Sequence, residues 1–232
     1  MIDWHNHILP GVDDGSSSDI ESVRMLEMQA IQGVNTVIAT PHFYANDESA
    51  ESFFQRRGEA FEILKDKMHS GLPRIILGAE VRYYQGISKL NELKSFCIEG
   101  SKLLLLEMPM AVWSEYMIRE LVELSSENSL KIILAHGERY IKIQSKEVYK
   151  RLLESDILMQ VSADYFTSFS TKRRALSLLG EGYVHFIGSD CHNTTSRPPN
   201  IGKAFDTICK KFGVDFLNQM NEYGKSMLNY KK

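Results

Sequence analysis

Histidines and carboxylates recur in this 232-residue chain at the points where short apolar segments end. His5 and His7 form an H-x-H pair in MIDWHNHI, and residues two apart on a strand point to the same side. Both imidazoles can therefore reach one metal ion. The loop GVDDG (residues 11–15) follows directly and carries Asp13 and Asp14. By itself such a loop would be interpreted as a solvated turn.

Further candidate ligands stand at or just after the ends of later apolar runs. They are His42 after VNTVIAT, Glu80 in RIILGAE, Glu107 in KLLLLE, His136 in KIILAH, and Asp190 and His192 after VHFIGS. A carboxylate at the end of an apolar run is costly to bury without a partner. Six of the seven candidate strands show this pattern, which favours one shared site for divalent cations over coincidence. His69 and His185 do not fit it, and we interpret both as structural or exposed.

The segments that must position these residues alternate between two kinds. Candidate strands lie near residues 1–8, 34–40, 74–80, 102–107, 131–136, 157–161 and 184–189. Candidate helices lie near 18–32, 48–69, 113–128, 145–155, 170–180 and 200–212, with a final amphipathic helix in 213–232 that ends in a solvated Tyr-Lys-Lys. Continuous apolar strands are typical of parallel sheets covered on both faces. The pattern predicts an α/β protein whose seven strands form a closed or nearly closed barrel, with the strand ends converging on one face.

Length and composition limit the kind of protein. We expect residues 1–232 to form a single domain. The net charge is −3, from 27 basic and 30 acidic residues, which argues against nucleic acid or an anionic membrane as main partner. We find no apolar run long enough for membrane insertion and no secretory signal at the start. The unclustered Cys97, Cys191 and Cys209 are expected to be reduced thiols, which points to the cytoplasm.

Taken in order, these motifs resemble the polymerase-and-histidinol-phosphatase (PHP) superfamily. They are HNH (5–7), DDG (13–15), TPH (40–42), GAE (78–80), Glu107, AHGERY (135–140) and SDCH (189–192). The blocks HILPGVDDG and AHxERY and the closing RPP (197–199) make the chain most similar to the metal-dependent tyrosine-protein phosphatases of bacterial capsule and exopolysaccharide operons. The resemblance runs from Met1 to beyond Arg197 without large gaps.

This resemblance implies a distorted seven-stranded (β/α) TIM-like barrel that carries three divalent metal ions. It favours manganese, with iron or zinc as alternatives that also suit nitrogen and oxygen ligands. By position, the first ion would be held by His5, His7, Glu80 and Asp190, and the second by Glu80, Glu107 and His136. The third would be held by His42, His192 and an acidic residue of the DDG motif. We favour Asp14, but the sequence leaves Asp13 open.

The resemblance also implies a catalytic apparatus. Arg139 and Arg197 match arginines that contact phosphate, and His42, His192 or the DDG carboxylate would assist protonation of the leaving group. Gly137 stands where we expect proline in this branch, which would loosen the loop that presents Arg139. The substrate would be phosphotyrosine on a protein, in this branch the tail of a bacterial tyrosine autokinase. Loop aromatics could flank its ring: Phe43, Tyr44, Tyr140, Tyr165 and Phe166.

Three alternatives remain on the sequence. Cys191 and Arg197 have the C-x5-R spacing of cysteine-based phosphatases, but Pro198-Pro199 disfavours the helix that such a loop needs at its arginine. A small-molecule phosphatase of the histidinol-phosphate type would share the ligand set. A non-enzymatic metal-stabilised module is the third, although such domains usually lose ligands.

Overall fold

The strands of the protein are short and all of their pairings are parallel. The computed structural model describes residues 1–90, 92–127 and 130–228. Its strands are β1 (Ile2–Asn6), β2 (Thr36–Ala39), β3 (His42–Phe43), β4 (Arg74–Leu77), β5 (Glu80–Arg82), β6 (Leu103–Glu107), β7 (Lys131–Leu134), β8 (Leu158–Ser162) and β9 (Phe186–Gly188). They form two hydrogen-bonded sheets, in the orders β1-β2-β4 and β3-β5-β6-β7-β8-β9.

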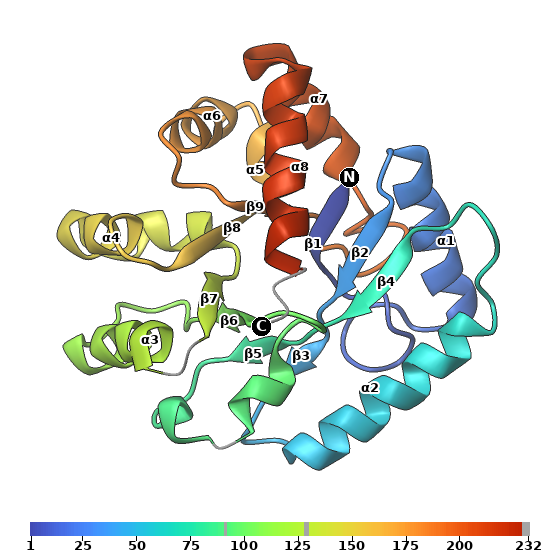
Figure 1. Cartoon of the computed structure of the whole chain (residues 1–232), viewed down its shortest axis with the longest axis horizontal. Coiled ribbons are helices and arrows are strands. Elements are labelled where there is room, and N and C mark those ends of the chain that lie inside the picture. The colour runs from blue at the N-terminus through green and yellow to red at the C-terminus, as the bar shows by residue number, and fades with distance from the viewer. Residues whose placement is uncertain (91, 128–129, 229–232) are drawn as a thin grey trace.

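Backbone hydrogen bonds also connect the two sheets. Asp190 N donates to His5 O at 2.7 Å and His7 N donates to Cys191 O at 3.0 Å, which places the end of β9 beside β1. The parallel strands therefore curl around a common centre (Figure 1). The predicted α/β class and parallel sheet are confirmed, whereas a single seven-stranded barrel stays a prediction.

One predicted strand is divided in the structure, and another is followed directly by a separate short strand. The segment 34–40 contains β2 and is followed by β3, and the break falls at Thr40-Pro41, where proline cannot donate a ladder hydrogen bond. The segment 74–80 contains β4 and the start of β5, with Gly78 at the break. A Cβ on Gly78 would lie 3.2 Å from Ile98 Cγ1, so this close approach suits glycine.

Helices surround the strands, as Figure 1 shows. The α-helices are α1 (Asp19–Ile31), α2 (Ala50–Lys65), α3 (Glu115–Glu127), α4 (Lys146–Leu153), α5 (Ala163–Thr167), α6 (Lys172–Gly180), α7 (Ile201–Phe212) and α8 (Val214–Leu228). Short 3-10 helices are η1 (Ile87–Lys89), η2 (Leu93–Phe96) and η3 (Gly137–Lys142). The sequence predicted every α-helix except α5, and none of the 3-10 helices. Residue 128 of one predicted helix and the final Tyr-Lys-Lys lie outside the described residues.

Helix α1 illustrates how the sequence sets the ends of these elements. The Ser18 side chain accepts a hydrogen bond from Glu21 N, which satisfies a free amide of the first turn. After the helix, Gly33 adopts a φ of +80°, a left-handed conformation that glycine tolerates best.

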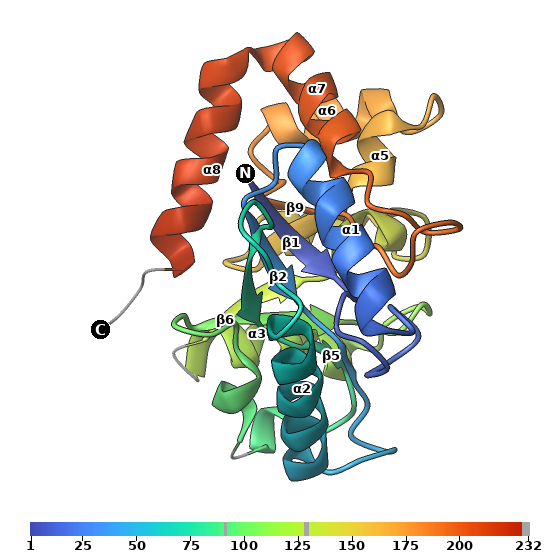
Figure 2. The ribbon, with the colours of Figure 1, turned by 90° about the vertical axis from the view of Figure 1, so that its right-hand side faces the viewer.

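The apolar core has two parts. The larger part packs helices against the outer faces of the strands, and the smaller lies among the strands themselves, with members such as Trp4, Leu105 and Phe186. Helix α8 adds Leu228 to this smaller part, and a Cβ on Gly224 would approach Trp4 to 2.7 Å. Figure 2 shows α8 beside the start of β1, so the helix covers the amino-terminal side of the strands.

Within the described residues, no helix combines the length and apolar character needed to cross a membrane.

Candidate metal centre

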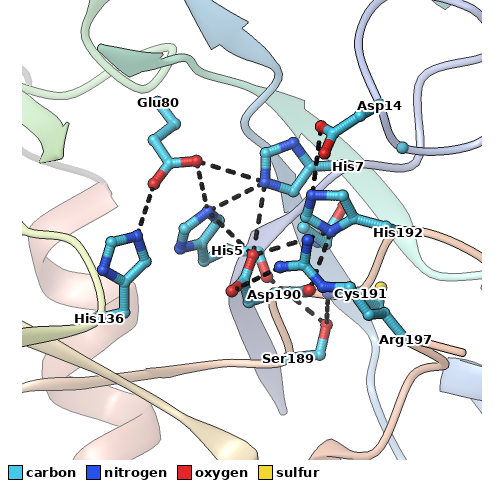
Figure 3. A network of polar contacts seen from close by, with 12 residues as sticks. His5, His7, Asp14, Glu80, His136, Ser189, Asp190, Cys191, His192 and Arg197 are labelled. Carbon is cyan, nitrogen blue, oxygen red and sulfur yellow. Dashed lines mark hydrogen bonds and ion pairs between the residues drawn. The ribbon is translucent and has the colours of Figure 1, made fainter. Parts of the chain in front are cut away.

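The carboxyl ends of the strands bring all nine predicted metal-ligand side chains into one cluster, part of which Figure 3 shows. In its first part, His5 Nε2 lies 3.1 Å from His7 Nε2 and 3.0 Å from Glu80 Oε2. Asp190 Oδ1 lies 3.7 Å from His5 Nε2 and 3.6 Å from His7 Nε2. These are the four side chains that the family resemblance assigned to one ion, and all four are buried.

The second part of the cluster is built around the other oxygen of Glu80. His136 Nε2 lies 3.0 Å from Glu80 Oε1 and 3.7 Å from Glu107 Oε1. Glu107 Oε2 accepts a hydrogen bond from Arg82 at 3.0 Å, which leaves Oε1 toward His136. Because its two oxygens face different partners, Glu80 lies between the first and second groups, as expected of a bridging ligand.

The third part contains Asp14, which is 66% exposed. Asp14 Oδ1 lies 3.5 Å from His42 Nε2 and 3.4 Å from His192 Nε2. Asp13 points elsewhere, since its carboxylate accepts hydrogen bonds from His7 Nδ1, His42 N and Gly15 N. The geometry therefore favours Asp14 over Asp13 for the third ion.

Local backbone features aim these side chains at one another. The register of β1 against β2 shifts between Asp3 and Asn6, an irregularity that re-aims side chains in a strand. His136 and Asp190 have positive φ values of 34° and 52° without being glycine, and such strain is often found at functional sites. A Cβ on Gly188 would lie 2.5 Å from His5 Cβ, so only glycine admits this imidazole beside β9.

Attraction between the imidazoles and the carboxylates of the cluster shifts their pKa values. Burial opposes the charged form of His5, but the carboxylates of Glu80 and Asp190 outweigh it and raise the His5 pKa. Burial likewise opposes ionisation of Glu80, yet His5 and the hydrogen bonds from neighbouring histidines hold its pKa well below the usual value. Ionised carboxylates therefore face imidazoles, and a bound cation would compete with the imidazole protons.

The polar atoms of the cluster fit divalent ions. The buried ring nitrogens His42 Nδ1 and His192 Nε2 make no hydrogen bond of good geometry within the described residues, although each faces a carboxylate oxygen: Glu80 Oε2 at 3.0 Å and Asp14 Oδ1 at 3.4 Å. A buried polar atom without a partner is costly, and a cation is one way to satisfy it. His5 Nε2 and His7 Nε2, which face each other at 3.1 Å, can share at most one proton. Imidazole and carboxylate donors in this number suit manganese, iron or zinc.

The two predicted phosphate-contacting arginines lie beside the cluster. Arg139 and Arg197 both form ion pairs with Asp190 Oδ2, and the Arg197 pair is 2.9 Å long. Their side chains are 38% and 43% exposed, so each keeps donors for an incoming anion. A Cβ on Gly137 would lie 2.7 Å from Met159 Cγ, so glycine lets η3 pack closely here; the loosening expected from the missing proline stays a prediction.

The aromatic residues predicted to flank a substrate ring divide into two groups. Phe43, Tyr140 and Phe166 are core residues with at most 2% exposure, so that expectation was wrong for them. Tyr44 is partly exposed and stacks on His42 with a centroid distance of 5.2 Å. Tyr165 lies in the wall of a cavity beside Asp190. Phe43, Tyr140 and Phe166 pack in the larger part of the apolar core, and the spacing of residues in the sequence did not indicate this burial.

The sequence analysis missed supporting residues beneath the cluster. Gln160 Oε1 lies 3.0 Å from His5 Nδ1 and accepts a hydrogen bond from His136 N at 2.7 Å. Asp3 accepts hydrogen bonds from Ser189 N and Ser189 Oγ at 2.8 and 2.6 Å, just before Asp190. A sequence signal was present for Gln160, which is the one polar residue in the apolar run ILMQV (157–161). Asp3 gave a weaker signal, because its predicted strand MIDWHNHI already holds other polar residues. His69 and His185 lie outside the cluster, as expected; His69 is exposed and His185 accepts from Met159 N.

The cysteine alternative does not fit this geometry. Cys191 is buried, its Sγ lies 3.4 Å from Gln29 Nε2, and burial raises the pKa of the thiol to about 12. A nucleophilic cysteine needs the opposite shift. Arg197 pairs with Asp190, and the next helix begins only at Ile201.

Fold and cluster together define an α/β protein with a curled parallel sheet, whose strand ends carry a candidate site for several divalent ions. Residues 1–228 match the model of the family described as "Capsular polysaccharide synthesis, CpsB/CapC", and the chain belongs to this family.

The similarity to individual known proteins covers nearly the whole chain. The chain is 31% identical over 234 residues to the tyrosine-protein phosphatase CpsB of Streptococcus pneumoniae, with 92% of each chain covered. It is 27% identical to the tyrosine-protein phosphatase YwqE of Bacillus subtilis strain 168, with 98% of this chain and 91% of YwqE covered. A solved structure from work on YwqE and CpsB, described as unique metal-dependent tyrosine phosphatases, matches with a TM-score of 0.82. That match has 23% identity and covers 100% of this chain and 96% of the other, and it shows the shared fold.

Proposed function

We propose that this protein is a metal-dependent protein-tyrosine phosphatase that acts in capsule or exopolysaccharide synthesis. The observation that carries this proposal is the convergence of nine imidazole and carboxylate side chains beside two partly exposed arginines. Membership of the CpsB/CapC family supports the biological setting, and the relatives named tyrosine-protein phosphatase support the substrate class. The substrate protein would be a bacterial tyrosine autokinase, and the location would be cytoplasmic.

We assign three divalent ions, preferably manganese, to the three groups of side chains. His5, His7, Glu80 and Asp190 would hold the first, Glu80, Glu107 and His136 the second, and Asp14, His42 and His192 the third. When bound, such ions neutralise phosphoryl oxygens and lower the pKa of a coordinated water. We further propose that the two sheets together form one distorted seven-stranded barrel, and that the chain is a single domain.

The chain's own residues would orient and protonate the substrate. A phosphate monoester carries about two negative charges at pH 7, and Arg139 and Arg197 offer planar, forked donors to its oxygens. Both guanidinium groups are held by Asp190, so they are positioned before substrate arrives. His42, His192 or Asp14 would supply the proton to the phenolate leaving group, since these three lie together at the most exposed part of the cluster.

The test compares phosphotyrosyl peptide with histidinol phosphate as substrates of the manganese-loaded protein. We expect turnover of the peptide with kcat/KM at least tenfold higher than for histidinol phosphate. The variant Arg197→Met should lose most of this turnover while keeping its bound manganese. A preference for histidinol phosphate would instead support the small-molecule alternative, and no hydrolysis of either substrate would contradict the enzyme assignment.

A further inference from the structure

A cavity of about 630 Å³ opens beside Asp190, outside the ring of metal-ligand side chains. Its wall is built by η3, α5, the α5–α6 connection, the segment after β9, and the start of α7. Asp190 is the one proposed ligand in this wall, and Arg139 and Arg197 stand next to it. The volume lies in the range of small-ligand sites, roughly 300–1,000 Å³. The cavity therefore begins where the phosphate would be held and extends away from the ions.

Two lysines in this wall have no charged partner. Lys142 at the end of η3 and Lys203 in α7 are exposed, and neither side chain has a hydrogen bond or ion pair within the described residues. Arg139 and Arg197 differ, because Asp190 already compensates part of their charge.

The acidic residues of the wall do not form ion pairs with the two lysines within the described residues. Glu138 is buried and its carboxylate accepts a hydrogen bond from Ser162 N at 3.3 Å. Asp164 Oδ1 is engaged by the side-chain amide of Asn200, which leaves its charge in place. The wall nevertheless holds four basic side chains (Arg139, Lys142, Arg197 and Lys203) against three acidic ones (Glu138, Asp164 and Asp190). Positive potential from Lys142 and Lys203 is therefore available to a ligand in the cavity.

We propose that this cavity binds an anionic side chain of the substrate next to the phosphotyrosine, and that Lys142 and Lys203 select it. The inference rests on the proposed function. With the phosphate held by Arg139 and Arg197, the adjoining peptide has to leave the cluster, and the cavity is contiguous with both arginines. The anionic group is a carboxylate or a second phosphate, since both suit lysine ammonium groups. Surface pairs of this kind are individually weak, so we expect a preference of about three- to tenfold.

The experiment uses the manganese-loaded full chain and three phosphotyrosyl peptides. They differ only beside the phosphotyrosine, where they carry Glu, Gln or a second phosphotyrosine. We expect kcat/KM for the Glu or the doubly phosphorylated peptide to exceed that for the Gln peptide about three- to tenfold. The ratio of kcat/KM for an anionic peptide to kcat/KM for the Gln peptide should fall toward one in about 0.5 M salt, because salt screens partly exposed charges. Which anionic peptide gains more identifies the group as carboxylate or phosphate.

A double variant, Lys142→Gln with Lys203→Gln, should reduce the ratio to about one. The matched control is Lys146→Gln with Lys210→Gln, which removes two exposed lysines close in sequence but outside the cavity wall and should keep the wild-type ratio. Equal turnover of all three peptides by the wild-type protein would overturn the inference, as would a preference that survives in the Lys142/Lys203 variant. Failure of the proposed function looks different, since no phosphotyrosyl peptide would then be hydrolysed.

Discussion

The Asp13 carboxylate lies 2.6 Å from His7 Nδ1 and thereby fixes the ring so that His7 Nε2 faces the candidate metal cluster. The same carboxylate oxygen accepts a hydrogen bond from His42 N at 2.9 Å. Asp13 thus orients two proposed ligands of different groups, a supporting role that often matters as much as ligation itself. Its neighbour Asp14 is exposed, and its Oδ1 faces His42 Nε2 and His192 Nε2 at 3.5 and 3.4 Å.

This difference predicts that Asn substitutions at the two positions act in distinct ways. Asp13→Asn weakens a buried, charge-assisted hydrogen bond, so we expect the metal-free protein to lose about 1.5–3 kcal/mol of unfolding free energy. Asp14→Asn should leave metal-free stability within about 0.5 kcal/mol, because the side chain is 66% exposed, but should lower the number of bound ions. Urea unfolding of EDTA-treated proteins and elemental analysis measure the two effects. Equal destabilisation by both variants would contradict the assigned roles.

Gln160 provides a second prediction about metal affinity. Its amide oxygen serves both His5 Nδ1 and His136 N, so it sets the orientation of two proposed ligands at once. Gln160→Met removes the acceptor at similar size, and we expect manganese to bind about 10- to 100-fold more weakly in calorimetric titrations. Gln160→Glu retains an acceptor and serves as the control that should keep most of the affinity. Unchanged affinity in the Met variant would show that Gln160 is only a packing residue.

Metal removal and thiol replacement should have opposite consequences. Because Cys191 is buried and its pKa is raised to about 12, Cys191→Ser should keep at least a third of the phosphatase activity. EDTA should abolish activity, and added manganese should restore it. Initial rates with a phosphotyrosyl peptide measure both. An inactive serine variant that folds normally, together with activity that survives EDTA, would revive the cysteine mechanism.

Glu120 predicts an acid-dependent loss of stability far from the cluster. It is 2% exposed and accepts hydrogen bonds from Tyr83 Oη, Gly86 N and Ser88. Burial alone would raise its pKa, but these donors outweigh it and lower the pKa below 4.5. A lowered carboxyl pKa contributes stability that is present above the unfolded-state pKa and is lost as the pH falls through the folded-state value.

We therefore expect Glu120→Gln to cost about 1–3 kcal/mol at pH 7 and less at pH 3.5. Urea unfolding at the two pH values measures the difference. Glu62→Gln, at a 64% exposed position, should change stability little at either pH. A cost for Glu120→Gln that is the same at both pH values would contradict the linkage.

Local sequence patterns predicted the residues at strand ends, but they did not predict the strand breaks or the burial of the loop aromatics. The clustering of proposed ligands such as Glu107 and His136 was predictable, because parallel strands place their carboxyl ends on one face whatever the details of packing. The breaks at Pro41 and Gly78, and the burial of Phe43, Tyr140 and Phe166, were not. They depend on neighbours that lie far away in the sequence, such as Ile98 beside Gly78.

The sequence by itself determined the α/β alternation, the candidate ligand set and the resemblance to a phosphatase family, since all three reside in residue type and spacing. Only the tertiary structure decided that Asp13 supports His7 while Asp14 faces His42 and His192. It also decided that Gln160 contacts two proposed ligands, and that two lysines without an ion pair to any described residue line the cavity beside Asp190. Those relationships are distances and directions between side chains from separate strands and loops. They arise when the curled sheet brings the strand ends together.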